Sequence, residues 1–293
     1  MTNNVQQGLI AKRTWTEEEI ARAEALLNKC NSYEGLYIKL TTVMLRNRPG
    51  DETNDFLYYE DDKLVGLLSF DDLGQEDREM TGMVHPDYRR RGIFSALLEA
   101  AKGEAKRRGI ERLIIVCERF SRSGQAFVEA IGAQYDFSEH KMILETFNER
   151  GPYREQIQIR LAGPEDVETL ASISALSFGR SVENARLHTI ASMNFPDSRF
   201  YLARLGRTAV GAFNIFFSDD ECGIYGVGVL PQYRGRAFGR QMLEQLIRSL
   251  RIEGWQQRIA LEVETNNTNA IGLYRSIGFK EVTTFGYYNL DIV

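Results

Sequence analysis

The chain has 293 residues, of which 43% are hydrophobic and 26% charged, and its formal net charge is −5 at pH 7. This length suits two domains of about 100–150 residues each. The mixed charges give no support for nucleic acid or an anionic membrane as a partner. The three cysteines lie far apart with no CxxC pair, so neither a disulfide framework nor a metal site is predicted. Because no leader pattern or long apolar run occurs, we expect a cytoplasmic protein.

The first half of the chain is typical of a mixed α/β domain. Thr16 and Glu19 have the spacing of a capping box, which predicts a helix through about Lys29. An arginine-rich loop follows a predicted strand and leads into a helix that ends at Gly109. The remaining predicted elements are antiparallel strands in 58–70 and 78–84, a buried strand at 112–117, a helix near 122–131 and a closing strand at 141–144.

The second half repeats this order of elements. A helix begins near Pro164, and a second helix, after a glycine- and arginine-rich loop, ends at Gly254. The other predicted elements are strands at 199–205, 209–217, 223–229, 258–264 and 286–292 and a helix near 268–277.

The similarity of the two halves is an internal repeat. Tyr88 and Arg89 correspond to Tyr233 and Arg234 at an offset of 145, and the offset becomes 146 further along the chain. Such a register indicates duplication of a whole domain. We place the boundary in the polar, turn-prone segment around residue 152, which predicts domains at 1–151 and 152–293.

The loop between strand and helix suits a phosphate group. Backbone N–H groups at a helix N-terminus have no partner in the helix, and the helix dipole favours negative charge there. Gly235 and Gly239 allow close approach to the backbone, and three arginines add positive charge. The alternative is a solvated basic turn, but the recurrence of this loop in both halves favours a phosphate site. Neither GxxxxGK[ST] nor GxGxxG occurs.

Two segments, "GVGVLPQYRGRAFGRQML" and "LEVETNNTNAIGLYRSIGF", resemble the characteristic motifs of the GCN5-related N-acetyltransferase (GNAT) superfamily, whose loop pattern is [Q/R]-x-x-G-x-[G/A]. The resemblance covers the second repeat nearly end to end and extends to residues 82–98 and 123–133 of the first. It implies two tandem GNAT-like domains of mixed α and β structure, each with a mostly antiparallel central sheet flanked by helices and with splayed strands four and five.

The same resemblance implies acetyl-CoA as cosubstrate, with its pyrophosphate on the loop and its pantetheine arm between the splayed strands. No metal is implied. The resemblance further implies that residues 177–198 are a variable region that determines the acceptor of the transferred group. In the second repeat the implied cofactor residues are Val227, Val229, Arg234, Gly235, Arg236, Ala237, Phe238, Gly239, Arg240 and Asn269; in the first they are Val84, Arg89, Arg91 and Gly92.

Both loops depart from the family pattern. Ala237 replaces a glycine, which costs about 1 kcal/mol if the position needs a positive φ, and this would weaken CoA binding without abolishing it. Phe94 of the first repeat stands where Gly or Ala is expected. CoA binding to the first repeat is therefore left open.

The resemblance also implies catalytic roles. Tyr274 aligns with the general acid that protonates the departing thiolate; the alternative is a core aromatic residue. A backbone N–H around Val227 to Val229, where Gly226 and Gly228 permit a bulge, would stabilise the carbonyl oxygen. The expected base is Glu221, with Glu262 and Glu264 in reserve, although Glu221 also fits an ordinary turn. Asn269 either touches the pantetheine arm or caps its helix.

The first repeat lacks the acid, because Val128 and Ser123 stand where the second has Tyr274 and Asn269. Glu76 matches Glu221 in position, but a base alone is weak evidence, so we expect a degenerate copy. The predicted function is acetyl transfer to a primary amine of an unidentified small molecule or peptide, by a monomer or homodimer. The alternatives are a non-catalytic acyl-CoA-binding or interaction module and an active first repeat. The three histidines form no visible cluster.

Overall fold

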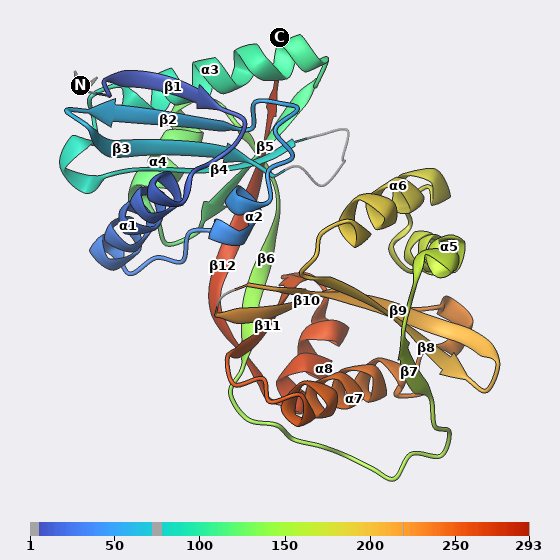
Figure 1. Ribbon diagram of the computed structural model, residues 1–293. Coiled ribbons are helices and arrows are strands. Elements are labelled where there is room, and N and C mark those ends of the chain that lie inside the picture. Colours follow the sequence, from blue (N-terminus) through green and yellow to red (C-terminus); the bar gives the residue numbers. More distant parts are fainter. Residues whose placement is uncertain (1–5, 72–77, 219, 293) are drawn as a thin grey trace. The chain divides into compact units, whose positions relative to one another are not determined.

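The computed structural model describes residues 6–71, 78–218 and 220–292 and divides into two compact units (Figure 1). Unit 1 comprises Met1–Ser138 with Thr283–Val293, and unit 2 comprises Glu139–Val282. Each unit combines a mostly antiparallel sheet with helices, which confirms the predicted fold class. No helix in the described part of the chain is both long and apolar enough to cross a membrane.

Unit 1 contains a sheet with strands in the order β1-β2-β3-β4-β5-β12-β6. Only the β4–β5 pair is parallel among the pairings from β1 to β12. Its elements are β1 (Gly8–Lys12), α1 (Glu17–Glu34), α2 (Thr42–Arg46), β2 (Asp55–Glu60), β3 (Lys63–Phe70), β4 (Arg78–Val84), the 3-10 turn Pro86–Tyr88, α3 (Ile93–Arg108), β5 (Arg112–Glu118) and α4 (Arg122–Ala130), with parts of β6 (Gln134–Leu144) and β12 (Phe279–Asp291).

Unit 2 repeats this plan with strands in the order β12-β6-β11-β10-β9-β8-β7. The β10–β11 pair is parallel, as β4–β5 is in unit 1. Its further elements are β7 (Gln158–Leu161), the 3-10 turn Pro164–Asp166, α5 (Val167–Phe178), α6 (Val182–Met193), β8 (Ser198–Leu205), β9 (Thr208–Phe217), β10 (Glu221–Val229), the 3-10 turn Pro231–Tyr233, α7 (Phe238–Ile252), β11 (Arg258–Glu264) and α8 (Thr268–Ile277).

The closing strands are exchanged between the two repeats. β12, from the second repeat, pairs its residues Phe285–Asp291 with β5 of unit 1. β6, from the first repeat, pairs its residues Glu139–Ile143 with β11 of unit 2. The compact units therefore divide at residues 138 and 282, whereas the repeat in the sequence divides near residue 152. The repeat identifies the duplicated segment but carries no information about the partner of its last strand.

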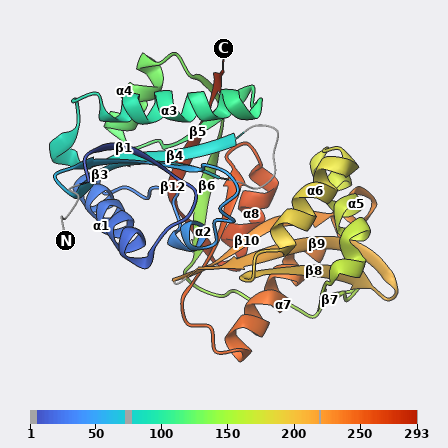
Figure 2. The same cartoon turned by 45° about the horizontal axis from the view of Figure 1, so that its top comes forward.

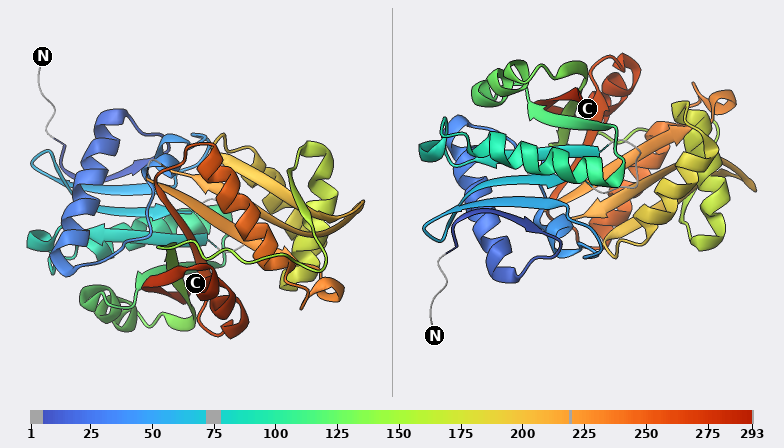
Figure 3. Two further views of the ribbon diagram at one scale, coloured as in Figure 1. Left: turned by 90° about the horizontal axis from the view of Figure 1, so that it is seen from below. Right: turned by 90° about the horizontal axis from the view of Figure 1, so that it is seen from above.

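Helices cover both faces of each sheet (Figures 2 and 3). In unit 1, α3 and Val128 of α4 pack in one core cluster, and α1 packs on the opposite face. In unit 2, α7 and α8 bury their apolar side chains on one face, and Leu170 and Ile173 of α5 pack on the other. This layering leaves the ends of β10 and β11 between α5 and α7.

Most predicted elements are present, and the Thr16–Glu19 capping box is formed. The helix predicted to Lys29 continues to Glu34 and ends at Gly35, whose φ of +67° is left-handed. Four helices or strands were not predicted, and one of them is β7, which has four residues. β1 and α2 are only five residues long, and α6 lies in the segment expected to be a variable region.

The parallel strand pair splays apart in both units, as expected. The β4–β5 ladder stops at Met80 and Ile115, although both strands continue. The β10–β11 ladder stops at Ile224 and Leu261 in the same way. Beyond these points β10 and β11 no longer pair with each other.

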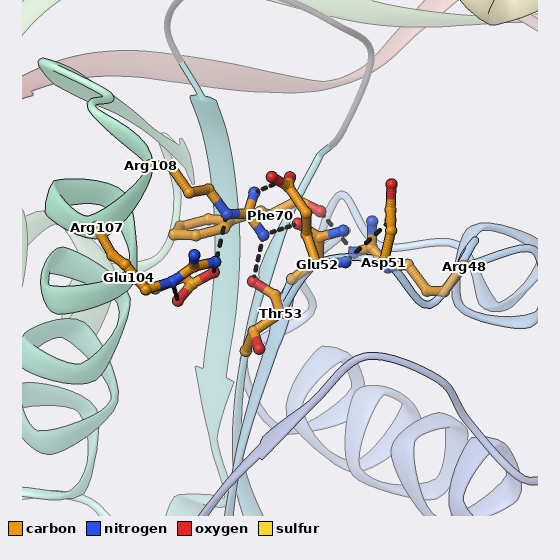
Figure 4. Close-up of polar contacts among 9 residues, drawn as sticks. Arg48, Asp51, Glu52, Thr53, Phe70, Glu104, Arg107 and Arg108 are labelled. Atoms are coloured by element: carbon orange, nitrogen blue, oxygen red, sulfur yellow. Dashed lines mark hydrogen bonds and ion pairs between the residues drawn. The ribbon is translucent and has the colours of Figure 1, made fainter.

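A buried ion pair connects the loop before β2 to the sheet of unit 1. Arg48 and Asp55 have side chains only 3% and 0% exposed, with 2.8 Å between Nη2 and Oδ1. Arg48 Nε also donates to Asp55 Oδ2 at 3.0 Å. Nearby, Arg108 of α3 pairs with Glu104 and Glu52 and donates to the Thr53 carbonyl (Figure 4). Charged side chains thus hold this loop against α3 and the strands.

Asp55→Asn should lower the free energy of unfolding of unit 1 by about 3–5 kcal/mol, because Arg48 would stay buried without its counter-charge. Denaturant unfolding of the full chain measures this. The control is Asp291→Asn, which breaks the exposed Arg112–Asp291 pair and should cost less than about 1 kcal/mol. Equal costs for the two changes would show that the buried pair is not stabilising.

Candidate active site

The loop that precedes α7 exposes a run of backbone donors. Gly235 and Ala237 have φ values of +76° and +60°, which turn the chain into the helix. The first bond that reaches back from α7 joins Gln241 N to Ala237 O at 3.1 Å. Among the described residues, the backbone N–H groups of residues 235–240 have no hydrogen-bond partner. Such donors at a helix N-terminus stabilise a phosphate group.

Ala237 adopts the left-handed conformation that the sequence analysis considered. Gly92 holds the same position in unit 1, with a φ of +77°. Ala237→Gly should raise the free energy of unfolding by up to about 1 kcal/mol, since the methyl strain is lost but the unfolded chain gains freedom. Because the strain is present without ligand, CoA affinity should change by less than about twofold. Unfolding and CoA titration check this, and a large gain in affinity would contradict a preformed loop.

The three arginines of this loop have different partners. Arg234 donates to the carbonyls of Val229 and Ser177, each at 3.0 Å, and so ties the loop to β10 and α5. Arg240 is buried, where it pairs with Glu244 at 3.1 Å and contacts Ser276.

Arg236 is partly exposed and pairs with Glu155, with 2.6 Å between Nε and Oε2. Its hydrogen bonds lower the pKa of Glu155. In the free protein all three guanidinium groups therefore have partners, and the unpaired donors of the loop are backbone N–H groups.

The predicted bulge is present in β10. Tyr225 pairs with Asn214 and Gly228 with Ala212, so Gly226 and Val227 together face the single residue Phe213. Gly226 has a φ of +59°, the left-handed glycine that such a bulge uses. The extra residue lacks a ladder partner, which leaves backbone groups at the splay available to a ligand.

Tyr274 lies on α8 beside the loop. Its neighbour Leu273 is so close to Gly239 that a Cβ there would be 3.4 Å from Leu273 Cδ2. The Tyr274 side chain is in the core with Phe279, 7% of the residue is exposed, and its hydroxyl has no hydrogen-bond partner among the described residues. Burial raises the pKa of Tyr274 to about 12. The hydroxyl therefore keeps its proton and can donate it.

The other predicted side chains lie at different places. Asn269 is exposed in the first turn of α8, but Asn267 is the residue that caps this helix, by accepting from Ala270 N at 3.2 Å. The cap interpretation of Asn269 is therefore wrong. Val227 and Val229 lie at the bulge and the end of β10, and Phe238 is buried at the start of α7.

Glu221 is not next to the bulge. It begins β10 and pairs with Lys141, with 2.6 Å between Nζ and Oε1. The six residue steps from Glu221 to Val227 span roughly 20 Å of strand. A base role for Glu221 would need a relay of water molecules, and it stays a prediction. Glu262 and Glu264 lie on β11, beyond the start of the splay.

Unit 1 has the same loop backbone with different residues. Arg90 and Gly92 have positive φ values, like Gly235 and Ala237. The N–H groups of residues 90–95 also have no partner in the described part of the chain. Arg89 donates to the Val84 carbonyl at 3.2 Å and pairs with Glu34; Arg91 donates to the Asp87 carbonyl and pairs with Glu60.

Three differences separate unit 1 from unit 2. The register between β3 and β4 runs without a shift, so the bulge is missing. Phe94 contacts Phe127, with ring centroids 4.7 Å apart, and covers Gly82, where a Cβ would be 2.7 Å from its ring. Val128 is buried where unit 2 has Tyr274. Phe94 thus fills the space between β4 and α4. Glu76 lies outside the described residues.

The three cysteines lie in the interior of the protein. All three are free thiols in buried positions. Burial raises the pKa of Cys30 and Cys117 to about 11 and that of Cys222 to about 12. A thiolate acyl intermediate on these residues is therefore disfavoured.

The side chains that surround the bulge on the α5 face were not predicted from the sequence. Phe178 and Ser177 lie against Gly228, where a Cβ would be 3.4 Å from Phe178 Cε2 and 2.8 Å from Ser177 Oγ. Asn214 lies beside Gly226. The glycines at positions 223, 226 and 228 were a usable signal, since alternate small residues on a strand indicate close approach of other groups.

Comparison with known proteins agrees with this geometry. A family model described as the acetyltransferase (GNAT) family matches residues 20–133 and 168–279. The chain is 28% identical over 250 residues to the mycothiol acetyltransferase of Saccharomonospora viridis, covering 76% of this chain and 78% of that protein. It is 41% identical over 64 residues to the ribosomal protein bS18-alanine N-acetyltransferase of Salmonella typhimurium, covering 22% and 43%.

Solved structures share the two-unit fold. A GCN5-related N-acetyltransferase from Sphaerobacter thermophilus superposes with a TM-score of 0.76 at 18% identity and covers 99% of this chain and 97% of that one. A tandem GNAT protein from the clavulanic acid biosynthesis pathway gives a TM-score of 0.72 at 18% identity, with 97% and 98% covered. At this identity the likeness concerns the fold.

Proposed function

Because this chain belongs to the acetyltransferase (GNAT) family and is an acyltransferase, we propose that it moves an acetyl group directly from acetyl-CoA to a primary amine of a small molecule or peptide. The active site would lie in the second repeat, residues 152–293, and the first repeat, residues 1–151, would be a degenerate copy. One observation carries this proposal: the bulge, the open loop and the tyrosine occur together in unit 2, whereas unit 1 has lost the bulge and the tyrosine and has filled the space beside its loop.

The residues of unit 2 fit acetyl-CoA. The partnerless N–H groups of residues 235–240 would bind the pyrophosphate. The gap between β10 and β11 would accept the pantetheine arm, with the exposed side chain of Asn269 near its path. Gly239 has no side chain between Val229 and Leu273, so the cosubstrate could approach the backbone there.

The proposed chemistry follows from these positions. The neutral amine attacks the acetyl carbon, and the carbonyl oxygen gains negative charge. A backbone N–H at the Gly226–Val227 bulge would donate to this oxygen. The carbon–sulfur bond then breaks, and Tyr274 would donate its proton to the departing thiolate. The amine proton would leave to solvent or, through water molecules, to Glu221.

Turnover with an amine panel tests the function. We expect CoA release from acetyl-CoA to depend on an added primary amine, and mass spectrometry to find one acetyl group on that amine. Tight CoA binding without acetylation of any amine would instead support a non-catalytic acyl-CoA-binding module. The wild-type protein is the appropriate sample, because the exchanged strands β6 and β12 connect the two repeats.

A further inference from the structure

Three side chains surround the bulge of β10 on one face of the sheet. They are Phe178 of α5, Asn214 of β9 and Tyr225 of β10, and we call them the acceptor patch. Tyr225 and Gly228 pair with Asn214 and Ala212, two residues apart on β9, so they face the same side. Ala212 packs with Leu170 and Ile173, and this side is therefore the α5 face.

Tyr225 lies flat along β10, and glycine makes this possible. A Cβ at Gly223 would be 2.6 Å from the Tyr225 hydroxyl and 2.7 Å from its ring. Despite this contact Tyr225 remains 43% exposed. Tyr225 stands one residue before the bulge, and its ring extends away from the bulge toward Gly223.

Phe178 bounds the bulge at its other end. It is 46% exposed and lies near Gly228, which again has no side chain to displace it. Tyr225 and Gly228 face Asn214 and Ala212, which are two residues apart on β9 and therefore about 7 Å apart. The two aromatic side chains thus flank the bulge within the length of a small molecule. Half-exposed aromatic rings on both sides favour an apolar group and, through their π faces, a cation.

Asn214 supplies a polar group between the two rings. Its side-chain oxygen would be 3.5 Å from a Cβ at Gly226, and the described residues provide no partner for its amide. Ser177 adds a second polar group, because its hydroxyl is buried beside Gly228 with no hydrogen-bond partner among the described residues. An amine bound at the bulge would contact these two uncharged polar groups. None of the side chains of the patch carries a charge.

The basic side chains near the patch are mostly engaged. Lys141 pairs with Glu221, and Arg234 donates to the Val229 and Ser177 carbonyls. Arg180, two residues after Phe178, is the exposed cation closest in sequence. A carboxylate next to the reacting amine would therefore find no cationic partner within the patch. Its desolvation would cost binding free energy.

We propose that the acceptor is a primary amine on an apolar, otherwise uncharged skeleton, held between Phe178 and Tyr225 with its nitrogen directed to Asn214. This inference rests on the proposed function and adds the chemical class of the acceptor and its specificity-determining residues.

The test compares 2-phenylethylamine with phenylalanine, which differ only by a carboxylate. We expect kcat/KM for 2-phenylethylamine to be at least about 10-fold higher, and Tyr225→Ala and Phe178→Ala each to lower it about 10-fold through KM. Gly223→Ala should act in the same direction, because its methyl group displaces the Tyr225 ring. The control Phe120→Ala removes an exposed ring of unit 1 and should change nothing.

A binding measurement separates this inference from acetyl transfer. Calorimetry with the CoA-saturated full chain should detect 2-phenylethylamine, and Tyr225→Ala should weaken that binding while the CoA affinity stays within about twofold. Such binding without turnover would refute the proposed function but retain the patch. Three outcomes would overturn the inference. Phenylalanine could be used as well as or better than 2-phenylethylamine, or Arg180→Ala could abolish the preference for 2-phenylethylamine. The third is that neither aromatic substitution has an effect.

Discussion

Replacing Tyr274 by phenylalanine should lower kcat by about 10²-fold or more while the CoA affinity stays nearly unchanged. The substitution removes one oxygen and keeps the ring that packs with Phe279. Because the pKa of Tyr274 is raised to about 12, the hydroxyl stays protonated, and kcat should show no fall from its ionisation below about pH 11. Steady-state kinetics across this pH range, with CoA titration of both proteins, measures the effect.

A second buried tyrosine of unit 2 gives the matched control. Tyr201 packs against Phe213 in the same core cluster, on β8, away from the loop. Tyr201→Phe should leave kcat within about twofold. If Tyr274→Phe retains full kcat, the acid assignment is wrong, and the thiolate must take its proton from water.

The largest expected change in binding comes from exchanging residues between the two loops. Gly239→Phe should raise the CoA dissociation constant by at least about 10²-fold, since a ring there would occupy the space beside Val229 and Leu273 where the cosubstrate is proposed to approach the loop. Conversely, Phe94→Ala should remove the ring that covers Gly82 and open the equivalent space in unit 1. Calorimetric titration should then find one CoA per wild-type chain, none for Gly239→Phe and two for Phe94→Ala.

Phe94→Leu is the control for the opening of unit 1. Leucine keeps most of the bulk beside Gly82, so this variant should still bind one CoA per chain. Two sites in the wild-type protein would show that Phe94 does not close unit 1. Unchanged affinity in Gly239→Phe would show that the cosubstrate does not pass this residue.

Much of the fold could be predicted from local patterns. These patterns depend on neighbours in sequence: the Thr16 capping box, the glycines that end the helices and the alternation along the strands. The repeat supported them, because the same order of elements occurs in both halves. The exchange of β6 and β12 could not be predicted in this way, because a strand carries no local signal for its partner. α6 was not recognised because its buried residues Ala185, Thr189 and Ser192 are small or polar.

The candidate site could likewise be predicted only in part. The loop, the bulge at Gly226 and the position of Tyr274 follow from motifs in the sequence. The contacts of Arg240 with the Asn148 carbonyl and of Glu221 with Lys141 do not, since both partners come from the end of the first repeat. The ring of Phe94 over Gly82 and that of Tyr225 over Gly223 are tertiary contacts, which only the packed structure shows.

The most direct test of the central claim, that unit 2 alone holds the working site, is a crystal structure with CoA. The account predicts the pyrophosphate on the N–H groups of residues 235–240, the pantetheine arm between β10 and β11, and the sulfur within hydrogen-bond distance of the Tyr274 hydroxyl, with unit 1 empty. A pyrophosphate bound at residues 90–95, or a sulfur out of reach of Tyr274, would contradict it.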